Sequence, residues 1–286
     1  MKTETVGKWS TKKKIFISVG IVMAVVLLVI AMDSRLLVCS YVLESDAVDA
    51  PVRIALVTDL HSCRYGDKQA ELIEAIQREN PDVILMSGDI FDDQKDDTNT
   101  DLFLAGLAGK YPMYYVTGNH EYRSGEDAFL NKMAILEKHS VTVLSDVSVT
   151  VEVGDQTLTL CGVNDPAVTK RMPDAGPYTA RLDLVKPIED ADTFTVLLAH
   201  RPEYFEAYAA RDFDLVLCGH AHGGQWRIPY LLNGLLAPNQ GFFPKYAGGL
   251  YEQDGTTMIV SRGLARETTL VPRIFNRPEL VIIEIQ

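Results

Sequence analysis

The sequence predicts an α/β fold in which two mixed β-sheets pack together and helices flank them. Apolar, strand-like runs alternate with helical segments in both outer thirds of the chain. In the middle third, apolar and polar residues alternate along short segments, which predicts β-hairpins in place of helices. Five of the six histidines follow an apolar run within three residues. Ligands gather beyond the carboxyl ends of strands in open α/β sheets, so these histidines mark one functional edge.

The N-terminal segment differs in composition from the rest of the chain. Residues 1–14 carry five lysines against one acid, and residues 15–32 contain neither a charge nor a proline. At about 1.5 Å per residue this run spans roughly 27 Å, close to the core of a bilayer. The residues after it form a poor signal-peptide cleavage site, so a retained anchor is favoured over a cleaved signal or a buried core helix.

The charges around this segment predict its orientation. Lysines precede the apolar run, which favours a cytoplasmic tail at 1–14, a transmembrane anchor at 15–32 and a single-pass location in the cell membrane. Residues 33–50 then form a linker with a first strand, and residues 51–286 form one extracytoplasmic domain. Six of the 27 basic and two of the 39 acidic residues lie in the first 40, so the remainder carries a net charge of −16. That charge argues against a nucleic-acid partner, and no protein partner is predicted.

The expected elements follow from hydrophobic periodicity and from turn residues. The expected strands cover residues 41–45, 52–58, 83–86, 113–117, 141–144, 147–153, 157–161, 194–199, 215–218, 258–261 and 280–285. The expected helices cover residues 67–80, 101–108 and 203–210, with another around residues 129–136. Residues 164–187 are predicted to be loop and short helix, whereas residues 223–250 show no clear periodicity.

Seven polar side chains follow the predicted strands at their carboxyl ends. They are Asp59, His61, Asp89, Asn119, His200, His220 and His222. A glycine-rich turn that carries two histidines by chance would explain residues 219–224 alone, but the clustering of the other histidines favours a shared metal site. Seven nitrogen and oxygen groups exceed the needs of one tetrahedral zinc. They suit two divalent cations such as Mn, Fe or Zn, about 3.5 to 4 Å apart, which is the spacing for phosphoryl transfer.

Further residues are candidates for catalysis or for binding. His120 follows Asn119 and is placed to protonate a leaving group, with Asp92 as the acid that orients it. Arg123, Arg201 and Arg262 are candidates for binding a phosphate, although a surface ion pair is the commoner role for an arginine. Glu121 is expected to hold the loop. The apolar side chains that follow His222 have two interpretations. One is an apolar lip that contacts a lipid or the membrane, and the other is ordinary packing within the domain.

The sequence also resembles the calcineurin-like metallophosphoesterases over residues 50–286. The similarity rests on five blocks in order, which are Asp59-Leu60-His61, Gly88-Asp89-Ile90-Phe91-Asp92, Gly118-Asn119-His120-Glu121, Ala199-His200 and Gly219-His220-Ala221-His222. The resemblance implies a four-layer α/β/β/α sandwich. It also implies that one metal is bound by Asp59, His61, Asp89 and His222, that the other is bound by Asp89, Asn119, His200 and His220, and that His120 is the acid.

Within this family the chain resembles the bacterial membrane-associated branch, some members of which cleave phosphodiesters or lipid-linked sugar pyrophosphates. The expected function is therefore that of a membrane-anchored phosphoesterase that uses two divalent metals, with manganese as one candidate. It is expected to hydrolyse a phosphodiester or pyrophosphate bond by a metal-bridged hydroxide, and a lipid-linked substrate is one option. The alternatives are a catalytically silent binding protein on the same fold and a nucleotide phosphodiesterase. Two departures stand out, since Ala265 replaces a glycine of the branch and Asp93 stands where protein phosphatases have an arginine.

Overall fold

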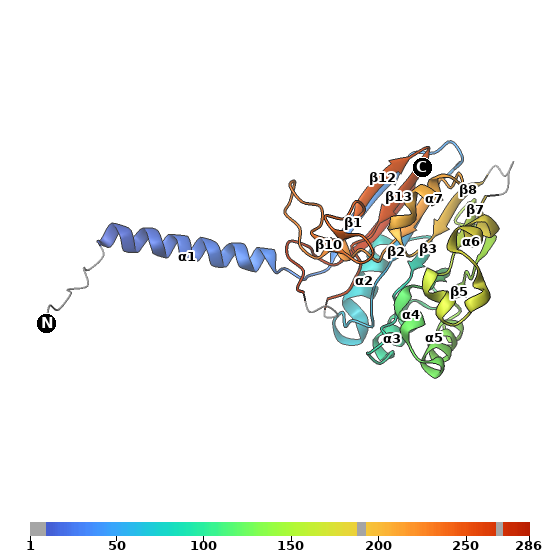
Figure 1. The fold of residues 1–286 in the computed structure, drawn as a ribbon, viewed down its shortest axis with the longest axis horizontal. Coiled ribbons are helices and arrows are strands. Elements are labelled where there is room, and N and C mark those ends of the chain that lie inside the picture. Colours follow the sequence, from blue (N-terminus) through green and yellow to red (C-terminus); the bar gives the residue numbers. More distant parts are fainter. Residues whose placement is uncertain (1–9, 188–192, 267–270) are drawn as a thin grey trace.

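The computed structural model describes residues 10–187, 193–266 and 271–286. One long helix, α1 (Thr11–Ala31), projects from the domain (Figure 1). It begins inside the expected tail because the Ser10 side chain accepts a hydrogen bond from the Lys13 amide at 3.4 Å and caps the helix. Within the described ranges, α1 is the one helix long and apolar enough to cross a membrane. The rest of the expected tail, residues 1–9, lies outside the described residues.

The first sheet has six strands in the order β1-β14-β2-β3-β4-β5. These strands are β1 (Leu37–Leu43), β14 (Glu279–Ile285), β2 (Val52–Val57), β3 (Val83–Ser87), β4 (Met113–Val116) and β5 (Thr142–Val143). The sheet is mixed because β14 runs antiparallel to β2, whereas β2 to β5 are parallel. Strand β1, which the sequence placed before the domain, pairs with β14 and is therefore part of this sheet.

The second sheet also has six strands, in the order β12-β13-β9-β8-β7-β6. These strands are β12 (Gly249–Gln253), β13 (Thr256–Val260), β9 (Leu215–Cys218), β8 (Phe194–Leu198), β7 (Gln156–Gly162) and β6 (Val147–Val153). Both edge strands are antiparallel to their neighbours, and the four inner strands are parallel. A short pair, β10 (Leu236–Ala237) and β11 (Gly241–Phe242), lies outside both sheets.

Three apolar cores join the layers into the four-layer α/β/β/α sandwich that the sequence predicted. The central core lies between the sheets and includes Leu56, Leu85 and Leu217. A second core joins the first sheet to α2 (Ala70–Glu79), α3 (Thr98–Leu107) and α5 (Glu126–Lys138). A third joins the second sheet to α6 (Tyr178–Val185) and α7 (Phe205–Ala209). Short turns complete the path, namely α4 (Asn119–Arg123), η1 (Asp67–Gln69), η2 (Pro166–Lys170), η3 (Pro173–Ala175), η4 (Pro202–Tyr204) and η5 (His222–Gly224).

Local predictions differ from the structure where tertiary contacts override periodicity. The helix expected at 67–80 is interrupted, because Lys68 and Gln69 have positive φ angles of 48° and 66°. The Gln69 side chain there accepts a hydrogen bond from the Tyr65 amide and donates one to the Cys63 carbonyl oxygen. Strand β12 was not predicted, because its alternation of half-buried and exposed residues gives a weak apolar pattern.

Candidate metal centre

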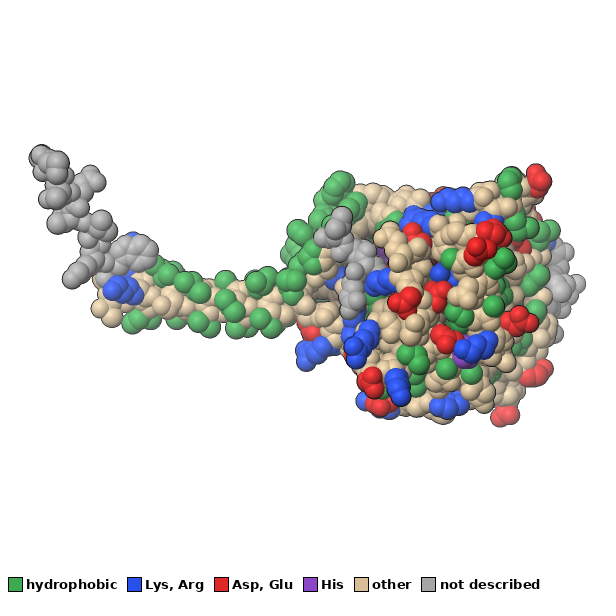
Figure 2. Space-filling view, turned by 90° about the horizontal axis from the view of Figure 1, so that it is seen from below, with side chains coloured by type: hydrophobic (Ala, Val, Ile, Leu, Met, Phe, Trp, Pro, Cys, Tyr) green, Lys and Arg blue, Asp and Glu red, His purple; other side chains and the backbone are tan. Residues whose placement is uncertain are grey.

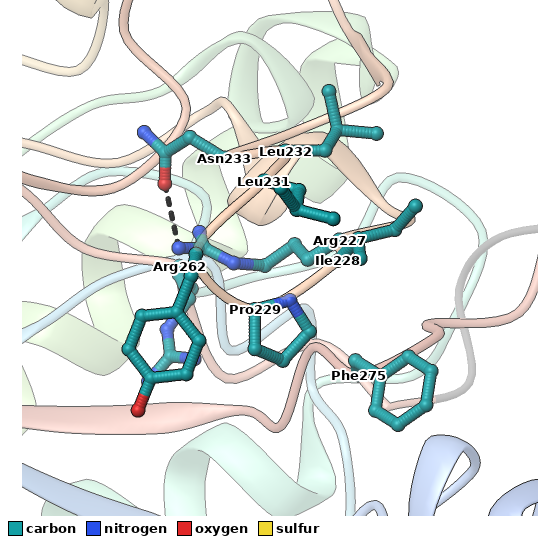
Figure 3. A pocket seen from close by; sticks show the side chains of 9 residues that line it. Arg227, Ile228, Pro229, Leu231, Leu232, Asn233, Arg262 and Phe275 are labelled. Atoms are coloured by element: carbon teal, nitrogen blue, oxygen red, sulfur yellow. Dashed lines mark hydrogen bonds between the residues drawn. The ribbon is translucent and has the colours of Figure 1, made fainter.

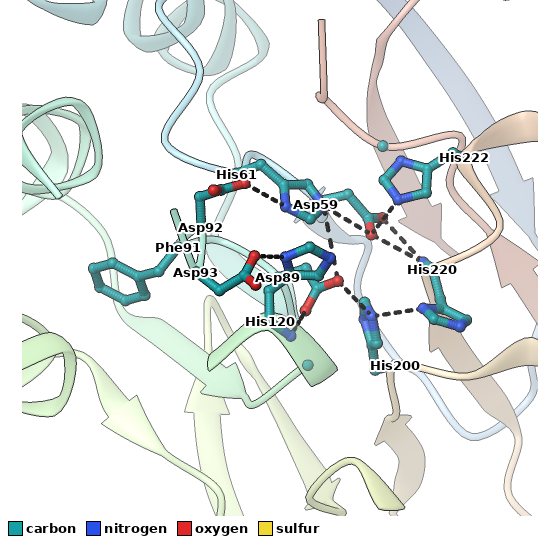
Figure 4. Close-up of polar contacts among 12 residues, drawn as sticks. Asp59, His61, Asp89, Phe91, Asp92, Asp93, His120, His200, His220 and His222 are labelled. Carbon is teal, nitrogen blue, oxygen red and sulfur yellow. Dashed lines mark hydrogen bonds and ion pairs between the residues drawn. The ribbon is translucent and has the colours of Figure 1, made fainter. Parts of the chain in front are cut away.

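The seven candidate ligands follow five strands whose carboxyl ends meet at one edge of the sandwich. Three strands of the first sheet, β2, β3 and β4, and two of the second, β8 and β9, supply them. Because all five run parallel within their sheets, their ends converge. Figure 4 shows the aspartates and histidines pointing toward one another from these separate elements. All seven are buried, each with 7% or less of its surface exposed.

The backbone has a strained conformation at most of these seven residues. Five of the seven have left-handed φ angles, which are 49° at Asp59, 47° at His61, 52° at Asp89, 64° at His220 and 48° at His222. Such angles cost on the order of 1 to 3 kcal/mol each and concentrate at functional sites. The sharp turns after β2, β3 and β9 aim these side chains at the shared edge.

Asp59, His61 and His222 form the first group. The Asp59 Oδ1 atom lies 4.0 Å from His61 Nε2 and 3.8 Å from His222 Nε2. Each residue offers one ligand atom, and the three atoms lie within 4.8 Å of one another, which is close enough to surround one cation. The Asp59 carboxylate is also held in place, since both of its oxygens accept from the His220 amide at 3.1 Å.

Asp89, His200 and His220 form the second group, whose ligand atoms also lie within 4.8 Å of one another. His200 Nε2 lies 3.1 Å from Asp89 Oδ2 and 3.2 Å from His220 Nδ1. The same Asp89 oxygen lies 3.7 Å from His61 Nε2 of the first group. Asp89 therefore stands between the two groups, where a carboxylate can bridge two cations.

Several ligand atoms lack a hydrogen-bond partner. Among the described residues, Asn119 Oδ1, His61 Nε2 and Asp89 Oδ2 are buried without one. Leaving a buried polar atom unpaired costs about 1 to 3 kcal/mol, so native proteins rarely do it without a ligand. Bound cations would satisfy these oxygen and nitrogen lone pairs, and the donor set fits divalent metals of intermediate softness.

Outer hydrogen bonds select which nitrogen of each histidine faces the centre. His200 Nδ1 contacts the Ser87 carbonyl oxygen at 2.8 Å, which leaves Nε2 for the centre. His220 Nε2 contacts Asn239 Oδ1 at 2.8 Å, which leaves Nδ1. Outer partners of this kind fix the tautomer and the ring orientation of ligating histidines. Sequence reasoning missed Asn239, because it lies in the aperiodic stretch and no pattern marks it.

The buried charges favour ligation. Burial lowers the pKa of His220 and of His222 well below the ordinary value, so both rings stay neutral and keep a free lone pair. Burial opposes ionisation of Asp89, but the contact with His200 outweighs it and lowers the pKa of Asp89 well below its usual range. The site thus presents a carboxylate at Asp89 and neutral imidazoles at His220 and His222. Burial opposes protonation of His200, but the contact with Asp89 outweighs it and raises the pKa of His200 to about 10.

His120 lies at the rim of the centre, and its orientation corrects one prediction. Its Nδ1 contacts Asp93 Oδ1 at 2.5 Å, so Asp93 orients it in place of the expected Asp92. Asp92 Oδ2 instead lies 3.3 Å from His61 Nδ1, which turns His61 Nε2 toward the centre. Two adjacent carboxylates project in different directions from this loop, and sequence spacing does not tell which one meets which histidine. Arg123 donates a hydrogen bond to His120 Nε2 at 3.0 Å.

Two of the three predicted phosphate-binding arginines are paired with carboxylates. Arg201 is paired with Asp165, with Nε 2.5 Å from Oδ2 and Nη2 3.0 Å from Oδ1. Arg262 is paired with Glu279, with Nε 2.5 Å from Oε2. Their role in substrate binding stays a prediction, and the ion pairs favour the alternative interpretation.

Glu121 holds the loop, as expected. Its carboxylate accepts hydrogen bonds from the amides of Gly118 at 2.8 Å, Asp89 at 3.2 Å and Phe91 at 3.1 Å. These bonds tie the turn after β3 to the start of α4, and so fix Asp89 relative to Asn119 and His120.

Gly219 is one position where a small substitution should disturb the centre directly. A Cβ atom there would lie 2.3 Å from Asp59 Oδ2, so Gly219→Ala is expected to displace that carboxylate. We expect metal affinity to fall about 10- to 100-fold, measured by titrating the stripped chain with Mn²⁺. Gly125→Ala is the matched control, because a Cβ atom there meets nothing within 4 Å. Equal affinities for the two variants would contradict the prediction.

Comparison with known proteins identifies similar sequences. The sequence profile described as calcineurin-like phosphoesterase matches residues 52–224. A Helicobacter pylori J99 protein named uncharacterized metallophosphoesterase is 33% identical over 226 residues, which cover 76% of this chain and 55% of that protein. The phosphodiesterase YaeI of Escherichia coli K12 is 27% identical over 240 residues, with 82% of this chain and 83% of YaeI covered.

Two further similarities involve a longer relative and a solved structure. A Bos taurus protein named transmembrane protein with metallophosphoesterase domain is 30% identical over 233 residues, with 75% of this chain and 48% of that protein covered. The chain spans little more than half the length of the Helicobacter and Campylobacter relatives that it matches. A dimetal phosphatase structure from Danio rerio has a TM-score of 0.46 at 13% identity, over 74% of this chain and 88% of that chain.

Proposed function

Because the chain belongs to the calcineurin-like phosphoesterase family, we propose that it hydrolyses a phosphoester by means of two divalent cations. In this proposal one cation is bound by Asp59, His61, Asp89 and His222, and the other by Asp89, Asn119, His200 and His220. The observation that carries the proposal is the position of Asp89 Oδ2, which lies between His61 of one group and His200 of the other. When bound, the two cations would polarise the phosphoryl oxygens and activate a water molecule.

The residues at the rim support a role in proton transfer. His120 is half-buried, its side chain keeping 21% exposure, so it can meet a substrate that enters from solvent. In the proposal the substrate displaces Arg123 from His120 Nε2, the protonated ring then donates from that nitrogen to the leaving oxygen, and Asp93 stabilises the ring orientation through Nδ1. Arg123, which contacts the other ring nitrogen, supplies positive charge beside the departing group.

We also propose that α1 anchors the chain in a membrane, with the domain on the extracytoplasmic side. The apolar helix and the Bos taurus relative that is named a transmembrane protein support the anchor. The lysines before the helix support the orientation. The E. coli relative named a phosphodiesterase supports a phosphodiester as the substrate class, with lipid-linked phosphoesters included because the anchor would hold the site near lipids.

The proposed activity is tested by removing and restoring the metals. The full chain, purified in mild detergent and stripped with EDTA, is expected to hydrolyse bis-p-nitrophenyl phosphate only after Mn²⁺, Fe²⁺ or Zn²⁺ is returned. Metal analysis of the active form should find two ions per chain. The monoester p-nitrophenyl phosphate, run in parallel, reports the preference between diester and monoester. A restored chain that binds two ions and cleaves neither compound would favour the silent binding protein instead.

A further inference from the structure

A surface segment beside the end of α1 exposes many apolar side chains. Within residues 226–243, here called the apolar loop, Tyr230 is fully exposed, and Leu231, Phe242 and Phe243 keep 85%, 70% and 69% of their surface exposed. Figure 2 shows hydrophobic side chains gathered at the end of the domain from which α1 projects. Exposed apolar groups concentrated in this way mark an interaction surface.

The apolar loop is joined to the end of α1 by a short series of backbone contacts. The Phe275 amide donates to the Ala31 carbonyl oxygen of α1 at 2.7 Å. The neighbouring residue, Ile274, accepts from the Arg227 amide of the apolar loop at 2.9 Å. The end of the helix and the base of the loop are thus held on the two sides of one segment. If α1 enters a bilayer, the apolar loop must lie at the surface of that bilayer.

A pocket of about 470 Å³ opens beneath the loop. Figure 3 shows Arg227 and Arg262 within it, with Leu231 and Phe275 among the apolar side chains around them. Arg262 is neutralised by Glu279, whereas Arg227 Nη2 is bound at 2.6 Å by a neutral group, Asn233 Oδ1. Arg227 Nη1 has no hydrogen-bond partner in the described part of the chain. The pocket therefore carries positive charge that the surrounding side chains do not balance.

We propose that this pocket binds the phosphate of an anionic phospholipid from the leaflet beside α1, while the apolar loop inserts among the acyl chains. The inference rests on the membrane anchor proposed above. An anionic phosphate complements Arg227, and the apolar rim of the pocket complements the lipid tails. This second attachment would fix how the domain is oriented on the membrane, which one helix followed by a linker cannot do alone.

The chemistry of the loop favours a bilayer over a protein partner. Tyrosine and tryptophan are enriched at membrane interfaces, and Trp226 and Tyr230 lie at the start of this loop with 43% and 107% exposure. Basic groups beside apolar ones favour anionic leaflets, each arginine contributing on the order of a fivefold gain in binding. The backbone contacts that join the loop to the end of α1 through Ile274 and Phe275 place it on the side of the domain that a bilayer around α1 would meet.

Trp226 provides a built-in reporter for this contact. The chain has two tryptophans, so Trp9→Phe leaves Trp226 as the sole fluorophore. The full-length variant is inserted into vesicles that contain phosphatidylcholine and an increasing fraction of phosphatidylglycerol brominated on its acyl chains. We expect Trp226 to be quenched more strongly than when the same fraction of brominated phosphatidylcholine is used. Arg227→Gln should raise the phosphatidylglycerol fraction at half-maximal quenching about fivefold. Arg78→Gln, which changes an exposed arginine of α2, should leave it unchanged.

A second pair of variants tests the contribution of the apolar side chains to membrane insertion of the loop. Leu231→Ser is expected to reduce quenching by either brominated lipid, and Leu184→Ser, which alters an exposed leucine of α6 with 71% exposure, should not. Both positions are exposed, so neither substitution threatens folding.

A vesicle flotation assay distinguishes two negative outcomes, namely that α1 does not anchor the chain and that the pocket does not bind lipid. A chain that does not float with the vesicles would overturn the anchor and the pocket together. A chain that floats while Trp226 remains unquenched, or is quenched equally by both lipids, would overturn the pocket inference alone. Quenching that inorganic phosphate abolishes would assign the pocket to free phosphate and overturn the lipid assignment.

Discussion

Asp89→Asn is expected to lower kcat on a phosphodiester by about 10³-fold or more, because metal-ion charge stabilisation is worth several kcal/mol. Asp89 Oδ2 faces both groups of ligands, so replacing its carboxylate weakens both proposed metal positions at once. An amide keeps an acceptor for the His120 amide, which now donates to Asp89 Oδ1 at 2.8 Å, so the loop should retain its shape. The measurement is kcat at saturating substrate, together with the metal content of the purified variant.

Asp155→Asn is the matched control for this variant. Asp155 is exposed in the hairpin turn between β6 and β7, so the same chemical change there should leave activity and metal content unaltered. If Asp89→Asn kept two ions per chain and its kcat stayed within about tenfold of the unmodified protein, bridging by Asp89 would be rejected.

His120→Gln is expected to lower the rate about 10²- to 10⁴-fold on an alkyl phosphodiester, which is the range for loss of a general acid. The loss should be much smaller on a p-nitrophenyl diester, because a nitrophenolate departs without needing a proton. Metal content should not change, since His120 lies at the rim and its Nδ1 is already bound to Asp93. The comparison of the two leaving groups therefore separates proton donation from a structural role.

Asp93 and Asp92 provide the matched pair for this prediction. Asp93→Asn should show the same dependence on leaving group as His120→Gln, with a smaller loss, since only the orientation of the ring is weakened. Asp92→Asn should instead lower metal affinity about 10- to 100-fold, because its carboxylate lies against His61. Equal behaviour of the two variants in both assays would show that neither carboxylate has the partner-specific role assigned to it.

Much of this organisation was predictable because short-range patterns determine it. Buried parallel strands appear as near-continuous apolar runs, so β2, β3, β8 and β9 were expected close to their observed bounds. A polar residue directly after such a run must lie at the carboxyl end of the strand. That rule alone predicted which side chains meet at the edge, and their convergence follows from parallel pairing.

Other features were not predictable because they depend on contacts between distant segments. Strand β1 joins the first sheet only because β14, more than 230 residues later, offers it an edge. Asn239 meets His220 through the path of an aperiodic loop. The pairing of Arg201 with Asp165, and of Arg262 with Glu279, likewise depends on which carboxylate the fold brings near.

Local sequence patterns were enough to predict the apolar N-terminal helix, the alternation of strands and helices, and the set of side chains that follow the strand ends. Hydrophobic periodicity and residue chemistry are local properties, so they can be recognised before the chain folds. The folded chain was needed to show that Asp93 rather than Asp92 contacts His120, that Asp89 stands between the two groups, and that the base of the apolar loop lies beside the end of α1. These are distances of a few ångströms between segments far apart in the chain, and packing sets them.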